Sequence, residues 1–259
     1  MFSVTNVKAI WKRELKGYFY TPMAWVFIGI FTLVMSIMFT AFLELYSQYT
    51  AASITGQAQN ITIDKLAEAF YANMHVVLMF FLPFLTMRTF TEEARQNTLA
   101  LLLTSPLSVI DITFAKFKAA GTVLFVMLAM TWVFPGFLFL YSKDGTPDIW
   151  VILSTYAGLM GAGLIYVSFG VFCSSITENP MVAVVLSFAC NFGLWLVSLG
   201  AQSSSGVIKE LLQFAAVNDH FQAFARGSPE LKSLVYFISM IGFGIFLTHR
   251  SVDSRAWRS

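Results

Sequence analysis

The chain has 259 residues, of which 57% are hydrophobic and only 12% are charged. A mean hydropathy of +0.71 would make a soluble domain prone to aggregate. The formal net charge of +2 is too small to indicate a nucleic-acid partner. These values exclude an ordinary soluble domain and indicate a protein whose solvent is lipid.

Six stretches contain no Asp, Glu, Lys or Arg and are long enough, or nearly so, to cross a bilayer. About 20 apolar residues at ~1.5 Å each cover the roughly 30 Å hydrocarbon core. The uncharged runs are 17–43, 69–87, 119–142, 149–177, 179–208 and 233–249. We therefore predict an all-α integral membrane fold, a single domain over 1–259, with six spans at approximately 22–43, 69–87, 117–141, 149–174, 180–200 and 231–248.

Residues 4–19, before the first span, have the pattern of an amphipathic helix. Basic side chains lie opposite an apolar face that includes Val4, Val7 and Tyr18. We expect an interfacial helix on the membrane surface. Its contact residues are predicted to be Lys8, Trp11, Lys12 and Leu15. An ordinary basic segment flanking the first span is the alternative, and the sequence leaves it open.

The segment between the second and third spans has the signals of a short helix. Thr89, followed three residues later by Glu92, forms a capping-box pattern, and Pro106 would end the helix. Ser108 with Asp111 starts the next helix, which becomes the third span. Glu92 and the glutamate after it are expected to be exposed at the helix N-terminus. We predict a rigid, charged cytoplasmic helix suited to transmitting force from a partner.

Four glycines in the fourth predicted span permit close approach of neighbouring helices: Gly158, Gly161, Gly163 and Gly170. Pro83 and Pro135 are expected to kink the second and third spans. No ionisable residue is expected near the middle of any span, which disfavours transport driven by protons or ions.

Two outer segments are predicted. Residues 44–68, rich in Gln, Thr, Ser and Ala, are expected to form a loop. Residues 200–232 contain a Ser-Ser-Ser-Gly hinge, which is followed by two predicted short re-entrant helices before span six. The two helices are expected to divide near 217–219, where Asn218 and Asp219 would cap the second. The apolar faces of these helices would form an outer gate of Val207, Leu211, Leu212, Phe221 and Phe224. A plain surface loop is the alternative.

The Lys and Arg residues between the spans predict the orientation, since cytoplasmic segments are enriched in both. Eleven of the 16 lie on the side of the two termini: Lys8, Lys12, Arg13, Lys16, Arg88, Arg95, Lys116, Lys118, Arg250, Arg255 and Arg258. The other side carries five: Lys65, Lys143, Lys209, Arg226 and Lys232. The asymmetry predicts that both termini are cytoplasmic (N-in/C-in).

Three motifs, taken in order, resemble a known family. The first is MRTFTEEARQNTLALLLTSPLS at 87–108, followed by Lys116, and the second is SSITENPMVAVVLSF at 174–188. The third is HFQAFARGSPELKSLVYFISMIGFGIFLTHRSVDSRAW at 220–257. Together they resemble the membrane (permease) subunits of type-2 ABC exporters over the whole chain, and most of all the gliding-motility permease branch. Asn97 stands where that family commonly has glycine.

The resemblance implies that the helix between spans two and three is a coupling helix, which docks in a cleft of a separate ATP-binding subunit. The ATPase-coupling interface that it implies comprises Phe90, Thr91, Glu92, Glu93, Arg95, Gln96, Asn97, Thr98, Leu99, Glu178 and Asn179. It also implies two copies of the ABC ATPase and a second permease subunit, in a homodimer or a heterodimer. In a heterodimer the second permease can carry a large periplasmic domain. The implied location is the bacterial inner membrane.

No catalytic, cofactor-binding or metal-binding residue is expected in this chain. None of its 16 glycines belongs to a Gly-x-x-x-x-Gly-Lys-Ser/Thr motif, so ATP and Mg are expected in the partner ATPase. We expect a permease that couples ATP hydrolysis in that partner to export, or to force transmission, across the inner membrane. The alternatives are an ion-coupled secondary carrier and a non-transporting membrane scaffold.

Overall fold

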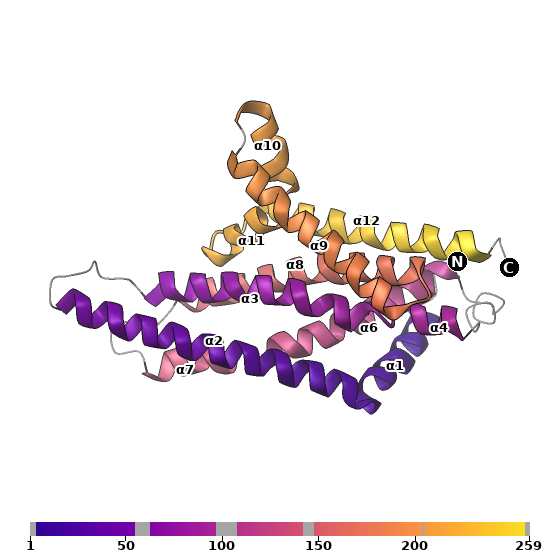
Figure 1. Cartoon of the computed structure of the whole chain (residues 1–259), viewed down its shortest axis with the longest axis horizontal. Helices are drawn as coiled ribbons and strands as arrows, with labels where there is room; N and C mark the ends of the chain where they lie inside the picture. The colour runs from indigo at the N-terminus through magenta and orange to yellow at the C-terminus, as the bar shows by residue number, and fades with distance from the viewer. Residues whose placement is uncertain (1–3, 55–62, 97–107, 142–147, 204, 257–259) are drawn as a thin grey trace.

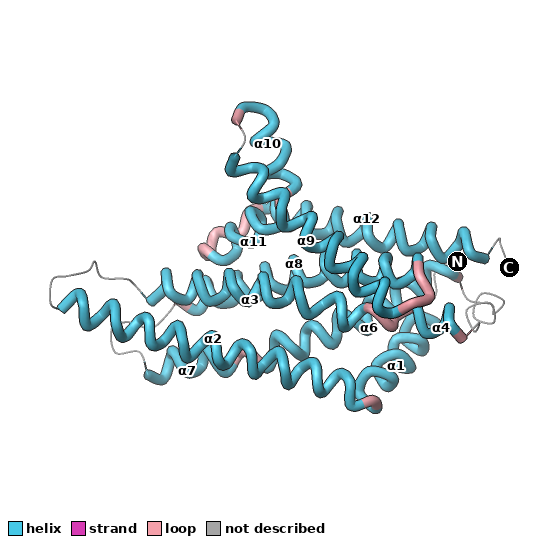
Figure 2. Tube along the Cα trace, in the orientation of Figure 1, coloured by secondary structure: helices cyan, strands magenta, loops and turns pink. Residues whose placement is uncertain are grey.

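The computed structural model describes residues 4–54, 63–96, 108–141, 148–203 and 205–256. Within these ranges the regular elements are helices and no strand occurs (Figure 2). The helices are α1 Val4–Tyr20, α2 Pro22–Ile54, α3 Ile63–Thr86, α4 Thr91–Arg95, α6 Val109–Met130, α7 Val133–Tyr141, α8 Ile149–Ile176, α9 Pro180–Ser203, α10 Gly206–Ala215, α11 Val217–Ala225 and α12 Leu231–Ala256. Figure 1 shows most of them running along one long axis.

Six helical stretches are long and apolar enough to cross a membrane, which confirms the predicted number. They are Pro22–Ala52, Ala67–Arg95, Val109–Leu140, Ile149–Ile176, Pro180–Ala201 and Leu231–Ser254. The first span continues into the segment predicted as an outer loop, since α2 ends at Ile54. Polar residues are accommodated there because Ser47 and Thr50 donate side-chain hydrogen bonds to carbonyls of their own helix, at 2.7 and 2.9 Å.

The third span consists of two helices, α6 and α7. Its first helix begins at the predicted cap, because the Ser108 hydroxyl accepts a hydrogen bond from the backbone N–H of Asp111 at 3.3 Å. The apolar stretch therefore starts at Val109, before the predicted bound of 117. A turn at Thr131 and Trp132 separates the two helices. Pro135 lies in the first turn of α7, where the lack of a backbone N–H costs little. Pro83, in contrast, lies inside the continuous helix α3.

Helix α8 is the most buried of the six spans and packs against α3, α6, α9, α11 and α12. Two of its glycines allow this. A Cβ on Gly158 would collide with Phe224 of α11, and a Cβ on Gly161 would collide with the Phe237 ring of α12. The predicted role of these glycines in close helix packing is therefore confirmed.

Helix α10 and the later part of α9 project away from the long axis of the bundle (Figure 1). No residue of α10 is buried, whereas α11 packs against α8. The two short helices divide at Ala216, the N-cap of α11, just before the predicted division near 217–219. The prediction that Asn218 and Asp219 cap α11 is wrong, because both lie inside its first turn and the cap has no side-chain hydrogen bond.

The start of α1, the helix α4 and the end of α12 lie at the same end of the bundle (Figure 1). Helix α1 packs against α6 and α2 there, with Val7 and Ile10 buried. We call this the charged end. It brings together segments that are distant in the sequence.

Replacing Gly161 with alanine should destabilise the bundle, because the added methyl group meets the Phe237 ring. Overpacking of this kind costs about 1–3 kcal/mol. Gly29 of α2 is the matched control, since nothing lies within 4 Å of the position of its Cβ. Gly29→Ala should cause no loss of stability and can add about 0.5 kcal/mol through helix propensity. Unfolding in mixed micelles measures the stability of both variants. Equal changes in stability would contradict the packing described for α8.

Candidate functional site

The charged end is organised around Lys116 of α6, whose side chain is 2% exposed. Its Nζ lies 2.9 Å from Glu93 Oε1 and 3.4 Å from Glu14 Oε1. It also donates a hydrogen bond to the Thr89 carbonyl at 2.7 Å, and lies 5.1 Å from the centroid of the Phe90 ring. A buried ammonium is stable only when it is paired and hydrogen-bonded, so these partners are required for the fold.

The ion pairs of Lys116 join three helices, because Glu14 lies on α1, Glu93 on α4 and Lys116 on α6. Arg13 extends the group, with distances of 2.9 Å to Glu14 and 3.5 Å to Glu93. The hydrogen bond from Arg13 to Glu14 raises the pKa of the guanidinium, against a smaller opposing effect of burial. We call Arg13, Glu14, Glu93 and Lys116 the ion-pair cluster.

Helix α4 begins differently from the prediction. Its N-cap is Phe90, which makes no side-chain cap, so the capping box of Thr89 and Glu92 is wrong. The Thr89 hydroxyl instead lies 3.4 Å from the Tyr18 hydroxyl of α1. Thr91 donates to the Met87 carbonyl at 2.6 Å. The Thr89 side chain thus contacts α1 and does not cap α4.

The predicted coupling residues divide into two sets. Phe90 and Thr91 are buried, and Glu93 is only 20% exposed because it faces Lys116. The expectation that both glutamates are exposed is therefore wrong for Glu93. Glu92, Arg95 and Gln96 are exposed. We call these three residues the α4 outer face.

Three further predicted residues, Asn97, Thr98 and Leu99, lie outside the described residues.

The turn between α8 and α9 contributes the other two predicted residues. Glu178 and Asn179 are exposed, and Asn179 Oδ1 accepts a hydrogen bond from the Met181 N–H at 2.9 Å. Helix α4 contacts α9, which starts directly after this turn. The fold thus places two predicted coupling segments, about 80 residues apart in the sequence, on neighbouring elements.

The predicted interfacial helix α1 packs mainly against protein. Lys8 and Lys12 are exposed, and Leu15 is half-buried. The Trp11 indole donates to the Thr122 hydroxyl of α6 at 3.1 Å, and Lys118 lies 4.7 Å from its ring centroid. Its apolar face is therefore directed to α6, while its lysines point away.

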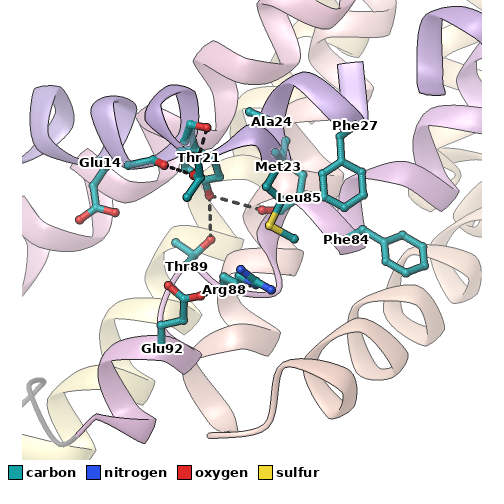
Figure 3. Close-up of a pocket in the computed structure, with 12 residues that line it drawn as sticks. Glu14, Thr21, Met23, Ala24, Phe27, Phe84, Leu85, Arg88, Thr89 and Glu92 are labelled. Atoms are coloured by element: carbon teal, nitrogen blue, oxygen red, sulfur yellow. Dashed lines mark hydrogen bonds and ion pairs between the residues drawn. The ribbon is translucent and has the colours of Figure 1, made fainter. Parts of the chain in front are cut away.

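A cavity of about 290 Å³ lies beside the ion-pair cluster. Figure 3 shows its two different ends: Glu14, Arg88 and Glu92 at one, and the rings of Phe27 and Phe84 at the other. Tyr18 closes one wall and donates to the Leu85 carbonyl at 3.4 Å. Burial raises the pKa of Tyr18 to about 12, so its hydroxyl remains a donor at neutral pH.

The five predicted gate residues do not share one buried surface. Phe221 and Phe224 of α11 are buried against the bundle. Val207 and Leu211 of α10 are 72% and 65% exposed, and Leu212 is half-buried.

The sequence did not predict a buried group of ring side chains that includes Phe221 of α11. His75 of α3 stacks on Phe221, with 4.6 Å between ring centroids, and its Nε2 lies 2.9 Å from the Tyr166 hydroxyl of α8. No local pattern marks this group, because its members come from three separate helices.

Among the described residues, no group of three or more His, Cys, Asp or Glu side chains is placed to hold a metal ion.

Six apolar helices and a charged end define a multi-pass membrane protein. A family model described as ABC-2 family transporter protein matches residues 8–245. The chain belongs to this family. Membership makes it a transmembrane component of an ABC transporter, embedded in the membrane, and implies an ATPase partner. No curated protein matches the chain.

Replacing Lys116 with methionine should destabilise the protein by about 2–4 kcal/mol, because Glu14 and Glu93 would face each other without an ammonium. Removing one partner of a fully buried pair costs about 3–5 kcal/mol, and partial exposure of the glutamates reduces this. Lys118→Met is the control, since exposed Lys118 contributes only a cation–π contact of about 0.5–1 kcal/mol. Unfolding in mixed micelles measures the stability of the two variants. Equal losses of stability would refute the role of Lys116.

Proposed function

We propose that this chain is the permease subunit of an ABC exporter and that a separate ATPase subunit docks on the α4 outer face and the adjoining Glu178–Asn179 turn. The observation that carries the proposal is the division of α4. Its inner side is fixed by the ion-pair cluster, and its other side presents Glu92, Arg95 and Gln96 to solvent. A short helix fixed on one side and exposed on the other is suited to receive a partner.

The ion-pair cluster gives this surface a route to the spans. Movement of a partner bound at Arg95 would displace α4, and Glu93 would carry the displacement to Lys116, near the start of α6. Glu14 would carry it to α1, which leads directly into the first span. ATP hydrolysis in the partner would thus reach the first and third spans together. The output is export, or force transmission of the gliding-motility type.

The proposed assembly follows from the same role. Both termini and the α4 outer face lie in the cytoplasm, as the excess of Lys and Arg at that end favours. The unit contains two ATPase subunits, which hold ATP and Mg, and a second permease, in a bacterial inner membrane.

Reversing the charge of Arg95 should uncouple the partner without unfolding the permease. Arg95 is exposed and belongs to no ion pair among the described residues. A like-charge contact at a docking interface costs several kcal/mol, and each 1.4 kcal/mol is about tenfold in affinity. We therefore expect Arg95→Glu to lower co-purification of the ATPase, and the ATP hydrolysis that the permease stimulates, at least tenfold.

Arg250→Glu is the matched control for Arg95→Glu. Arg250 is an exposed arginine near the end of α12, at the same end of the bundle as α4. The Arg250→Glu variant should co-purify with the ATPase to within about twofold of the wild type. Full complex formation and activity in Arg95→Glu would exclude the α4 outer face as the docking surface.

A further inference from the structure

The cavity beside the ion-pair cluster lies where the chain enters the membrane. Its walls come from α1, the first turns of α2, the last turns of α3, the segment that leads into α4 and the first turn of α4. Trp25 of α2 is 54% exposed close by, and its indole donates to the Phe19 carbonyl at 3.1 Å. Tryptophan side chains of this kind mark the boundary between lipid headgroups and hydrocarbon. The cavity is therefore at headgroup level.

The polar end of the cavity carries both signs of charge. Arg88 Nε lies 3.4 Å from Glu92 Oε1, and these side chains are 48% and 52% exposed. Such an exposed ion pair is weak, so either member can exchange its partner for a ligand. Glu14 is held by Arg13 and Lys116.

The groups facing the cavity and their direct partners balance. The positive groups are Arg13, Arg88 and Lys116, and the negative groups are Glu14, Glu92 and Glu93. A site of this kind has no net attraction for an anion. It favours a headgroup that carries one charge of each sign.

The other end of the cavity is apolar and leads to the surface that faces lipid. The rings of Phe27 and Phe84 stack with 6.3 Å between centroids (Figure 3). Phe84 is 43% exposed, and Ile30, one turn further along α2, is 47% exposed. A ligand with its headgroup at the charged end could extend hydrocarbon chains along these residues. A volume of about 290 Å³ is at the small end for ligand sites and suits a headgroup alone.

We propose that this cavity binds a zwitterionic phospholipid whose headgroup carries a primary ammonium, as in phosphatidylethanolamine. The phosphate lies at Arg88, the ammonium donates N–H bonds to Glu92, and the acyl chains run over Phe27 and Phe84. A primary ammonium is preferred to a quaternary one because carboxylates accept N–H bonds. A quaternary ammonium needs a cage of aromatic rings, and Tyr18 is the one ring among the described residues at the polar end.

A bound lipid would link α1 and α2 to the segment that leads into α4, next to the docking surface proposed above. The lipid site itself goes beyond the proposed function and does not depend on an ATPase. The two proposed surfaces share Glu92. Lipid retention is measured on the permease without an ATPase, and docking is tested at Arg95 outside the cavity lining, so failure of either proposal is visible separately.

Native mass spectrometry of the full purified chain tests the site, with phosphatidylethanolamine, phosphatidylcholine and phosphatidylglycerol of identical acyl chains added in turn. We expect phosphatidylethanolamine to be retained at least fivefold better than either of the others. Equal retention of phosphatidylcholine, or stronger retention of phosphatidylglycerol, would overturn the proposal. So would displacement of the lipid by an equal concentration of soluble phosphoethanolamine, which would show a site for a free solute.

Two variants locate the binding. Arg88→Gln should lower retention of phosphatidylethanolamine at least fivefold, whereas Arg95→Gln, the same change outside the cavity lining, should leave it unchanged. Glu92→Gln should remove the preference for phosphatidylethanolamine over phosphatidylcholine while both remain bound through Arg88. Wild-type retention in Arg88→Gln, or wild-type preference in Glu92→Gln, would refute the assigned contacts.

Discussion

A single buried ammonium determines the geometry of the charged end. Lys116 is 2% exposed, so its charge must be balanced by protein groups, and the groups that do so come from α1, α4 and the turn before α4. Helix α4 has five residues, and a helix of this length is not stable in isolation. Its position therefore depends on the bond between Glu93 and Lys116. The position of α4 in turn determines the docking surface, the route to the spans and one wall of the lipid cavity.

The rest of the bundle is organised by close packing around α8. Its glycines admit the aromatic rings of α11 and α12 in place of a Cβ, which fixes those helices on its surface. Helix α10 is different, because most of its apolar residues are exposed and it packs mainly on α9. These two consecutive helices thus differ in kind: α11 belongs to the core, and α10 is a projecting element on the surface.

The sequence predicts the number of spans because a run without charge over about 20 residues is itself the physical requirement for crossing lipid. It predicts the start of α6 because the cap of Ser108 and Asp111 is local. It fails where the deciding contact is distant. Glu92 and Glu93 are equivalent by sequence, and only Lys116, on another helix, makes one of them internal. Thr89 and Phe221 likewise take their roles from contacts across the bundle with Tyr18 and His75.

The most direct test of the central claim is site-specific photo-crosslinking in the native host. A photo-reactive residue in place of Gln96, on the α4 outer face, is compared with one in place of Ser228, an exposed position between α11 and α12. We predict that position 96 captures a protein with a phosphate-binding Gly-x-x-x-x-Gly-Lys-Ser/Thr motif and that position 228 does not. Capture of that ATPase from position 228 alone, or from neither position in an assembled and active transporter, would contradict docking at α4.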